Sequence, residues 1–345
     1  MPDLSTRFMG LALENPLIVG SSGLSDSADG VARLAEAGAG AVVLKSIFEE
    51  EIALEYQNAV REELRTGASP EALDYFDRQL RGERLDHYRT LIAESKRRVG
   101  VPVIASVNCT YSHEWVAFAR EMEAAGADAL ELNMFFLPTD WSRTAEEQEQ
   151  AYLRVVERVR DEVSIPVALK ISNYFTNLGP MIQRLSQTGI GGLVLFNRLW
   201  QPDFDIESLR VVPSHALSSP DEFTLPLRWL ALTSGRAACD LAASTGIHDG
   251  TTAIKMLLAG ARAVQVVSAL YRHGVGHLRA MLVDLARWMD DHGYTTIDEF
   301  RGLLSQSASA NPAVYERVQY MRTFGPAIEG DEGQRPPYGL EGPWR

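Results

Sequence analysis

Cysteine is almost absent from the sequence, since only Cys109 and Cys239 occur among 345 residues. Two cysteines cannot build a disulfide framework, and no Cys-x-x-Cys pair points to zinc or an iron–sulfur cluster, so no metal site is predicted. The sequence also has no apolar run of about 18 residues and no basic-then-apolar segment at its start. We therefore expect a cytoplasmic protein with no membrane partner.

Positive charge is also scarce. The chain has 33 Lys and Arg residues against 46 Asp and Glu residues, a formal net charge of −13. Nucleic acids and anionic membranes are bound by clustered Lys and Arg, so this balance argues against both as partners. A hydrophobic fraction of 46% with 23% charged residues excludes a disordered, collagenous or coiled-coil chain. The length fits two average domains or one large α/β barrel.

What the sequence does have is a short repeated motif, or phrase, that occurs four times. Each copy places a glycine after an amphipathic stretch and before an apolar run, and the copies lie at 37–44, 125–132, 188–195 and 259–266. A glycine just past a helix provides the left-handed residue that ends it, and the apolar run is typical of a buried strand. Apolar runs at 16–19, 101–107, 165–171 and 240–243 bring the predicted strands to eight.

Strands that alternate with helices predict a parallel sheet of the α/β class, and eight such units predict a closed (β/α)8 TIM barrel. The competing fold is a doubly wound sheet, but the sequence lacks the Gly-x-Gly-x-x-Gly motif that would follow the first strand of such a sheet. We predict one barrel domain over residues 1–325 and a Pro- and Gly-rich tail over 326–345. The long segments 47–100, 134–150 and 198–225 exceed ordinary strand-to-helix connections and are expected to form lids or interfaces.

Many polar side chains follow the predicted strands, and the active site of such a barrel lies at the carboxyl ends of its strands. Buried polar groups need partners, so lysines and asparagines that meet there favour an anionic, hydrogen-bonding ligand. Loops after the last two strands often bind phosphate, which fits Thr245-Gly246 and Ser268. Each residue also has a plain structural explanation, such as a lysine on a solvated rim or a simple turn at Thr245-Gly246. The candidates are Gly20, Ser21, Lys45, Ser46, Asn108, Cys109, Asn133, Lys170, Tyr174, Asn197, Arg198, Thr245, Gly246, Val267 and Ser268.

Eight ordered segments resemble the dihydroorotate dehydrogenase family, and most closely its soluble class-1 branch. They are NPLIVGSS (15–22), LKS (44–46), ELN (131–133), VALK (167–170), GLVLFN (192–197), TGI (245–247), GARAVQ (260–265) and GYTTIDEFRG (293–302). The resemblance implies a (β/α)8 barrel with FMN at its mouth, and hydride exchange between flavin N5 and a carbon–carbon bond next to a carbonyl. It further implies an enzyme that acts on a small-molecule substrate.

The resemblance also assigns roles to the candidates. Gly20, Ser21 and Ser46 line the flavin ring, while Lys45, Asn133 and Lys170 bond its polar edge and ribityl chain. Lys170 is the cation that stabilises the reduced ring. Asn197 binds the cofactor and, together with Asn108 and Arg198, the substrate. The phosphate is expected to be bound by Thr245, Gly246, Val267 and Ser268.

Two segments depart from the family pattern. Phe136 stands where the family has its catalytic Cys or Ser, and Phe48-Glu49-Glu50-Glu51 replaces the family's substrate-binding loop. A benzyl group cannot take a proton, so we consider Cys109 and Tyr174 as replacement catalytic residues, although either can be a packing residue. The substrate, whether dihydroorotate or another carbonyl compound, stays open.

Two other functions are compatible with these residues. Lys170 on a barrel strand could form a Schiff base, as in a lyase. The chain could also be a flavin-binding subunit that exchanges electrons with a partner and has no turnover of its own. As a relative of soluble dimeric enzymes it is expected to form a homodimer, with segment 198–225 and the helical pattern at 312–324 as possible interfaces.

Overall fold

The computed structural model describes residues 2–48, 70–108, 114–134, 136–198, 201–214 and 216–315. Within these residues eight parallel strands close into a barrel, because the last strand pairs with the first. In order around the barrel they are β3 (Leu17–Val19), β4 (Ala41–Val43), β6 (Val103–Asn108), β7 (Ala129–Met134), β8 (Val167–Ile171), β9 (Gly192–Leu195), β12 (Asp240–Ala243) and β13 (Ala263–Val266). A short strand, β5 (Ile47–Phe48), extends the pairing of β6. The predicted TIM barrel is confirmed, with all eight strands at the predicted positions.

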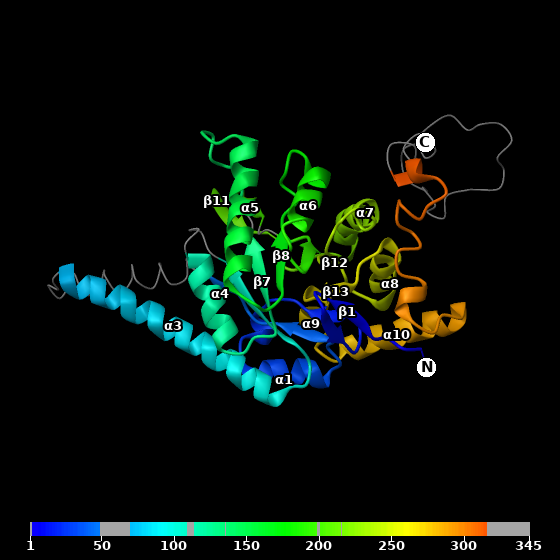
Figure 1. Ribbon diagram of the computed structural model, residues 1–345, viewed down its shortest axis with the longest axis horizontal. Coiled ribbons are helices and arrows are strands. Elements are labelled where there is room, and N and C mark those ends of the chain that lie inside the picture. Colours follow the sequence, from blue (N-terminus) through cyan, green and yellow to red (C-terminus); the bar gives the residue numbers. More distant parts are fainter. Residues whose placement is uncertain are drawn as a thin grey trace.

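Helices cover the outside of the barrel (Figure 1). They are α1 (Ala28–Glu36), α3 (Pro70–Arg98), α4 (Glu114–Ala124), α5 (Ala145–Glu162), α6 (Leu178–Ser186), α7 (Thr224–Thr233), α8 (Gly250–Ala259), α9 (Ser268–His273) and α10 (His277–His292). Short 3-10 turns lie at Gly23–Ser25, Pro220–Phe223, Ile297–Glu299 and Pro312–Tyr315. None of the helices in the described ranges is both long and apolar enough to cross a membrane.

The glycines of the four repeated phrases end helices, as predicted. Gly38, Gly126, Gly189 and Gly260 all have φ between 84° and 111°. At Gly260 the N–H donates to the carbonyl of Leu257 at 2.9 Å, which satisfies a carbonyl at the end of α8. The turn then leads directly into β13.

A hairpin that the sequence did not predict closes the amino-terminal end of the barrel. Strands β1 (Thr6–Phe8) and β2 (Leu11–Leu13) pair antiparallel, and their apolar residues pack inside the barrel with Met9. The strand residues around them include the small side chains Ala41, Ala129, Ala168, Ala242 and Ala263. A Cβ at Gly192 would lie 2.8 Å from the Phe8 ring, so this position needs glycine. The opposite, carboxyl end of the barrel is therefore the end that can hold a ligand.

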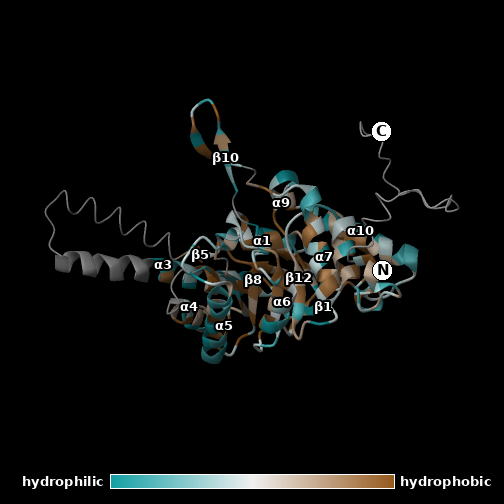
Figure 2. Ribbon diagram, turned by 90° about the horizontal axis from the view of Figure 1, so that it is seen from above, coloured by the Kyte–Doolittle hydropathy of each residue, from teal (hydrophilic) through white to brown (hydrophobic). Residues whose placement is uncertain are grey.

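The three long segments differ in structure. Segment 47–100 ends in α3, which packs Tyr88, Leu91 and Ile92 into the core and serves as the crossover helix between β4 and β6. Segment 134–150 leads into α5, and segment 198–225 contains the hairpin of β10 (Pro202–Asp205) and β11 (Arg210–Pro213), which projects from the body in Figure 2. The predicted tail 326–345 lies outside the described residues, as does most of 312–324.

Candidate active site

Lys170 lies at the centre of a buried polar cluster at the carboxyl end of the barrel. Its Nζ donates to Oε1 of Gln265 at 2.7 Å and lies 4.0 Å from Oε1 of Glu131. Nε2 of Gln265 donates in turn to the carboxylate of Glu131. The three residues come from β8, β13 and β7, so only closure of the barrel brings them together.

The charges in this cluster are shielded from water. Burial lowers the pKa of Lys170, and the nearby carboxylate of Glu131 opposes this shift because it favours the ammonium form. Glu131 is 2% exposed, and its Oε1 accepts no hydrogen bond within the described part of the chain. An ammonium held in this way can stabilise negative charge on a ligand at the mouth.

Asn133 lies beside Lys170, because β7 and β8 pair these two residues in register. Its Oδ1 is buried and has no hydrogen-bond partner among residues whose positions are described. A buried acceptor without a partner costs about 1–3 kcal/mol. The arrangement therefore favours a ligand that donates a hydrogen bond to Asn133 next to the Lys170 ammonium.

Serine hydroxyls line the other side of the mouth. The N–H of Ser46 donates to Oγ of Ser21 at 2.8 Å, and Oγ of Ser46 lies 2.6 Å from Oγ of Ser106. Gly20 precedes this chain of hydroxyls, and a Cβ there would lie 2.9 Å from the side chain of Val267 and 3.2 Å from Oε1 of Gln265. The glycine thus lets the backbone approach Val267 and Gln265 of the polar cluster closely.

Lys45 and Asn108 lie outside the polar cluster of Lys170, Gln265 and Glu131. Lys45 is exposed and lines a separate hollow with Asp26, His87 and Tyr88, next to α3. Asn108 is buried at the end of β6, where it pairs with Phe48. The structure therefore brings Lys170 and Asn133 together and directs Lys45 toward the α3 side.

The candidate phosphate end is built on two consecutive residues with positive φ, Thr245 at 80° and Gly246 at 76°. A β-branched residue rarely adopts this conformation, and such strain often marks a functional turn. The N–H of Gly246 donates to Oγ of Ser218 at 3.4 Å, and the N–H of Ser218 donates to Oγ of Ser268 at 3.0 Å. Val267 directly precedes Ser268 at the start of α9. The loop that carries Ser218 thus joins both predicted phosphate-binding segments.

His248 and Arg272 both contact the loop that carries Ser218. Oγ of Ser218 lies 3.1 Å from Nε2 of His248, and Arg272 donates to the carbonyl of Ser218 at 3.3 Å. Burial, reinforced by the positive charge of Arg272, lowers the pKa of His248. The histidine is therefore held in its neutral form, as an uncharged part of the phosphate end.

This pKa shift predicts a pH-dependent stability. The unfolded chain takes up a proton at His248 at about pH 6.5. The folded protein does so only at a lower pH, so acidification below about pH 6.5 favours the unfolded state. We expect the melting temperature to fall between about pH 7.5 and about pH 5.5, and H248Q to reduce that fall. Differential scanning fluorimetry over this range measures the effect. Exposed His292 provides the control variant H292Q, and an equal change in both variants would contradict the assignment.

The remaining candidates lie at the rim of the mouth. Tyr174, Asn197 and Arg198 line one hollow of about 190 Å³, with Asn173 between β8 and α6. Arg198 is not isolated, because its Nε donates to Glu222 at 2.8 Å. Cys109 lies outside the described residues.

Phe136 also lies at the mouth, where it contributes to a neighbouring cavity. Its N–H donates to the hydroxyl of Tyr152 at 2.8 Å, and the two rings pack edge to face. The position that resembles the family's catalytic Cys or Ser therefore carries an aromatic wall.

Sequence reasoning missed Glu131, Gln265, Ser218 and His248. Signals for the first two were present, because alternation along a strand places Glu131 on the same face as Asn133, and Gln265 is a polar residue inside an apolar strand. His248 could be placed beside the phosphate from its position two residues after Gly246, whereas Ser218 carries no such signal, since its role follows from the path of the long segment 198–225.

The fold is a (β/α)8 barrel, and the buried polar cluster lies at the carboxyl ends of its strands, where barrels of this class have their active sites. The family model for dihydroorotate dehydrogenase matches residues 3–289, and the chain belongs to that family. It is accordingly an oxidoreductase of the dihydroorotate dehydrogenase type.

Individual relatives agree with this membership. The chain is 28% identical over 320 residues to the catalytic subunit of dihydroorotate dehydrogenase B (NAD(+)) from Thermoplasma volcanium, covering 88% of this chain and 99% of that one. It is 26% identical to the chloroplastic dihydropyrimidine dehydrogenase (NADP(+)) of Arabidopsis thaliana, covering 87% of this chain and 76% of the relative. A crystal structure of dihydroorotate dehydrogenase from Eimeria tenella in complex with ferulenol shares the fold, with a TM-score of 0.63, 18% identity, and 88% and 89% of the two chains covered.

Proposed function

We propose that the chain is an FMN-dependent oxidoreductase that acts on a carbon–carbon bond next to a carbonyl. The observation that carries the proposal is that Lys170 and Asn133 are in register on neighbouring strands at the barrel mouth, with a buried ammonium on one and an Oδ1 on the other that has no partner among the described residues. A flavin ring has an acceptor edge that suits an ammonium and N–H groups that suit an amide oxygen. Membership in the family points to the same cofactor.

The surrounding residues fit FMN in shape as well as in charge. Gly20 brings its backbone close to Gln265 and would line the ring, while Ser21 and Ser46 would bond the ring or the ribityl chain. Thr245, Gly246, Val267 and Ser268 would hold the phosphate, for which this site offers backbone N–H groups and a hydroxyl. When bound, FMN would supply hydride exchange at its N5.

This chain's own groups would then orient the substrate and move its proton. Asn197 and Arg198 lie in the same hollow as Tyr174, and would bind the substrate beside the flavin with Asn108. Tyr174 is 41% exposed and carries a hydroxyl, so it can exchange a proton with both substrate and solvent. Cys109, also next to the end of β6, is the second candidate for this role.

The absorption spectrum of the purified protein tests the proposal. We expect flavin bands, FMN identified by mass after denaturation, and bleaching on reduction with dithionite. The variant N133L keeps the side-chain size but removes the amide, and should release FMN more readily than the parent protein. A colourless protein that cannot be reconstituted with FMN would overturn the proposal.

A Schiff-base lyase is the second candidate, favoured by the burial that lowers the pKa of Lys170. It predicts a borohydride-trapped substrate adduct on Lys170, whereas FMN bound beside an unmodified lysine contradicts it. A third candidate is a flavin subunit that passes electrons to a partner. Steady-state turnover by the isolated, FMN-loaded chain would exclude that function.

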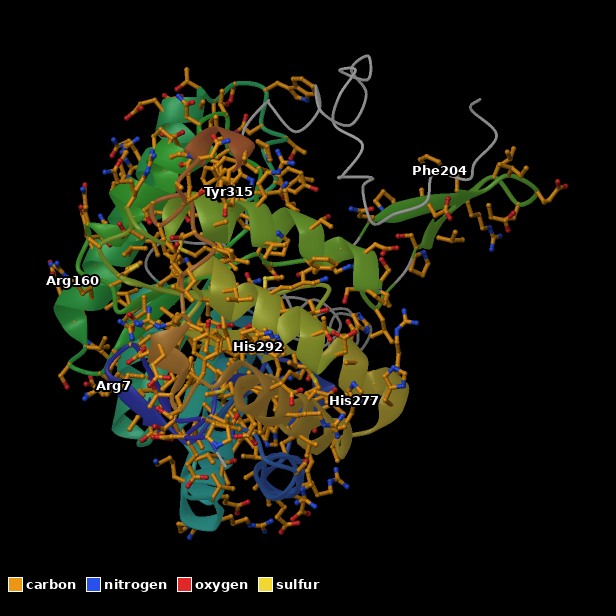
Figure 3. All side chains as sticks on the ribbon, turned by 90° about the vertical axis from the view of Figure 1, so that its right-hand side faces the viewer. Arg7, Arg160, Phe204, His277, His292 and Tyr315 are labelled. Carbon is orange, nitrogen blue, oxygen red and sulfur yellow. The ribbon has the colours of Figure 1, made fainter. Side chains whose placement is uncertain are left out.

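We also propose that the protein is a homodimer joined through the arm formed by β10 and β11. Their register puts Phe204 opposite Val211 and Pro202 opposite Pro213, so one face of the arm is entirely apolar. Phe204 is 69% exposed and stands well away from the barrel in Figure 3. An isolated two-stranded hairpin is marginally stable, so this face favours packing against a second copy.

The proposed interface predicts that changes in the arm alter the oligomeric state. The double variant F204S/V211S should turn the dimer into a monomer, because it removes the apolar contact between the two copies. The arm is remote from the barrel core, so the fold of each copy should not change. Size-exclusion chromatography with light scattering measures the mass. R210S, on the opposite face of the arm, is the matched control, and a dimer that survives the double variant would rule out this interface.

A further inference from the structure

A cavity of about 360 Å³ opens beside the candidate active site. Its walls come from the segments after β7 and after β8, the two strands that carry Asn133 and Lys170. Asn173 and Tyr174 line both this cavity and the hollow that contains Asn197. The cavity is therefore continuous with the region where the substrate would meet the cofactor.

Three aromatic rings form the main wall of the cavity. The ring centroids of Phe136 and Tyr152 are 5.0 Å apart at 69°, and those of Tyr152 and Phe175 are 5.1 Å apart at 64°. Both are favourable edge-to-face pairs, so the rings hold one another in place. Pro138 adds a further apolar surface.

Tyr152 contributes its ring and not a charge. Its hydroxyl accepts the N–H of Phe136, and burial raises its pKa to about 12. The polar end of this side chain is therefore satisfied within the protein. A ligand in the cavity meets apolar ring surface, with amide and hydroxyl groups from Asn173 and Tyr174 at the side of the active site.

The described residues that line the cavity include no cation for an anionic ligand. Among them the one charged residue is Glu149, whose carboxylate accepts a hydrogen bond from Arg184 at 2.7 Å. In the adjoining hollow the one cation among the described lining residues is Arg198, which is paired with Glu222. A substrate carboxylate would thus meet a carboxylate in the cavity and a neutralised guanidinium beside it.

We propose that this cavity, lined by Phe136, Tyr152 and Phe175, binds the aromatic or branched alkyl substituent of an uncharged carbonyl compound. The inference rests on the proposed FMN-dependent activity and names its substrate class: a neutral enone, or the corresponding saturated ketone, with an apolar group. The carboxylate of a dihydropyrimidine such as dihydroorotate would meet no unpaired cation among the described residues of this cavity. The volume agrees, since drug-sized ligand pockets begin at about 300 Å³.

The test compares two ligands that share one ring. Benzylideneacetone is a neutral aryl enone, and cinnamate carries a carboxylate in place of its ketone. We expect isothermal titration of the FMN-loaded protein to show benzylideneacetone binding about tenfold or more tightly than cinnamate or orotate. The variant F136S should weaken benzylideneacetone binding about tenfold, because it removes one aromatic wall.

L137S is the matched control, since Leu137 is the next residue, is 52% exposed and does not line the cavity. If F136S fails to fold, F136L keeps most of the volume and should still weaken binding by loss of the edge-to-face pair. Equal affinity for benzylideneacetone and cinnamate, or equal effects of F136S and L137S, would overturn the inference while FMN stays bound. Failure of the chain to bind FMN at all would instead overturn the proposed function.

Discussion

In the FMN-loaded protein, K170M is expected to slow reduction of the flavin by substrate about 10²- to 10³-fold. The Lys170 ammonium is buried, and it is fixed by Gln265 at 2.7 Å and by the charge of Glu131. Preorganised charges act strongly in such a water-excluded site, because they need no reorientation when negative charge develops on the ligand. Methionine keeps the length of the side chain but provides no charge.

Stopped-flow absorbance measures this rate, and the reduction potential of bound FMN provides an independent readout. Both should change, with the potential becoming more negative, because the reduced form loses its cation. K96M is the matched control, since Lys96 pairs with Asp128 directly before β7, at the opposite end of the barrel from Lys170. An unchanged potential in K170M, or an equal effect of K96M, would show that Lys170 does not stabilise the reduced cofactor.

The same variant should also destabilise the fold, and this effect can be separated from the chemistry. Removing one member of a buried ion pair typically costs about 3–5 kcal/mol, because the other charge stays buried alone. Glu131 would then be 2% exposed without its ammonium. The double variant E131Q/K170M removes both charges, so it should regain stability in thermal unfolding while the potential stays low.

The barrel strands were predictable because each has its own local signal. Gly38 and Gly260 end helices with positive φ directly before β4 and β13, and apolar runs mark the strands themselves. The hairpin of β1 and β2 had no such signal, because three-residue strands are too short to show alternation. The arm was missed for a different reason: its strands are only four residues long and lie inside a long insertion, and of the two only β10 alternates apolar and polar residues.

The polar contents of the mouth were predictable, but their partners were not. Lys170 and Asn133 follow from their place at strand ends. The bond from Lys170 to Gln265 spans 95 residues, and that from Gln265 to Glu131 spans 134, so both depend on closure of the barrel. Sequence position likewise could not show that Oγ of Ser46 contacts Oγ of Ser106 while Lys45 stays exposed.

The aromatic wall changes the meaning of the missing catalytic residue. From the sequence alone, Phe136 indicates the loss of the catalytic Cys or Ser, because a phenylalanine side chain cannot take a proton. In the structure its ring packs with Tyr152, which packs with Phe175 in turn. The phenylalanine at position 136 is therefore better explained by a different substrate class than by a barrel that has lost its activity.

G246A is expected to abolish FMN binding and to lower the melting temperature far more than an ordinary glycine substitution. Gly246 has φ of 76°, and a Cβ there would lie 2.1 Å from the backbone nitrogen of Phe223. Backbone atoms cannot rotate away as a side chain can, so the turn or the neighbouring segment must move. Either movement breaks the contact between Gly246 and Ser218 that joins the phosphate-binding segments.

G274A is the matched control because it isolates the backbone cost. Gly274 has φ of 80°, yet no atom lies within 4 Å of a Cβ built on it. Because φ of 80° with ψ of 163° is a region that essentially only glycine adopts, this variant should lose only the conformational contribution to stability, about 1–3 kcal/mol. Thermal unfolding of the apoproteins and the flavin-to-protein ratio after reconstitution measure the two effects separately. If G246A and G274A lose equal stability and both retain FMN, close packing at the phosphate end has no role in holding the cofactor.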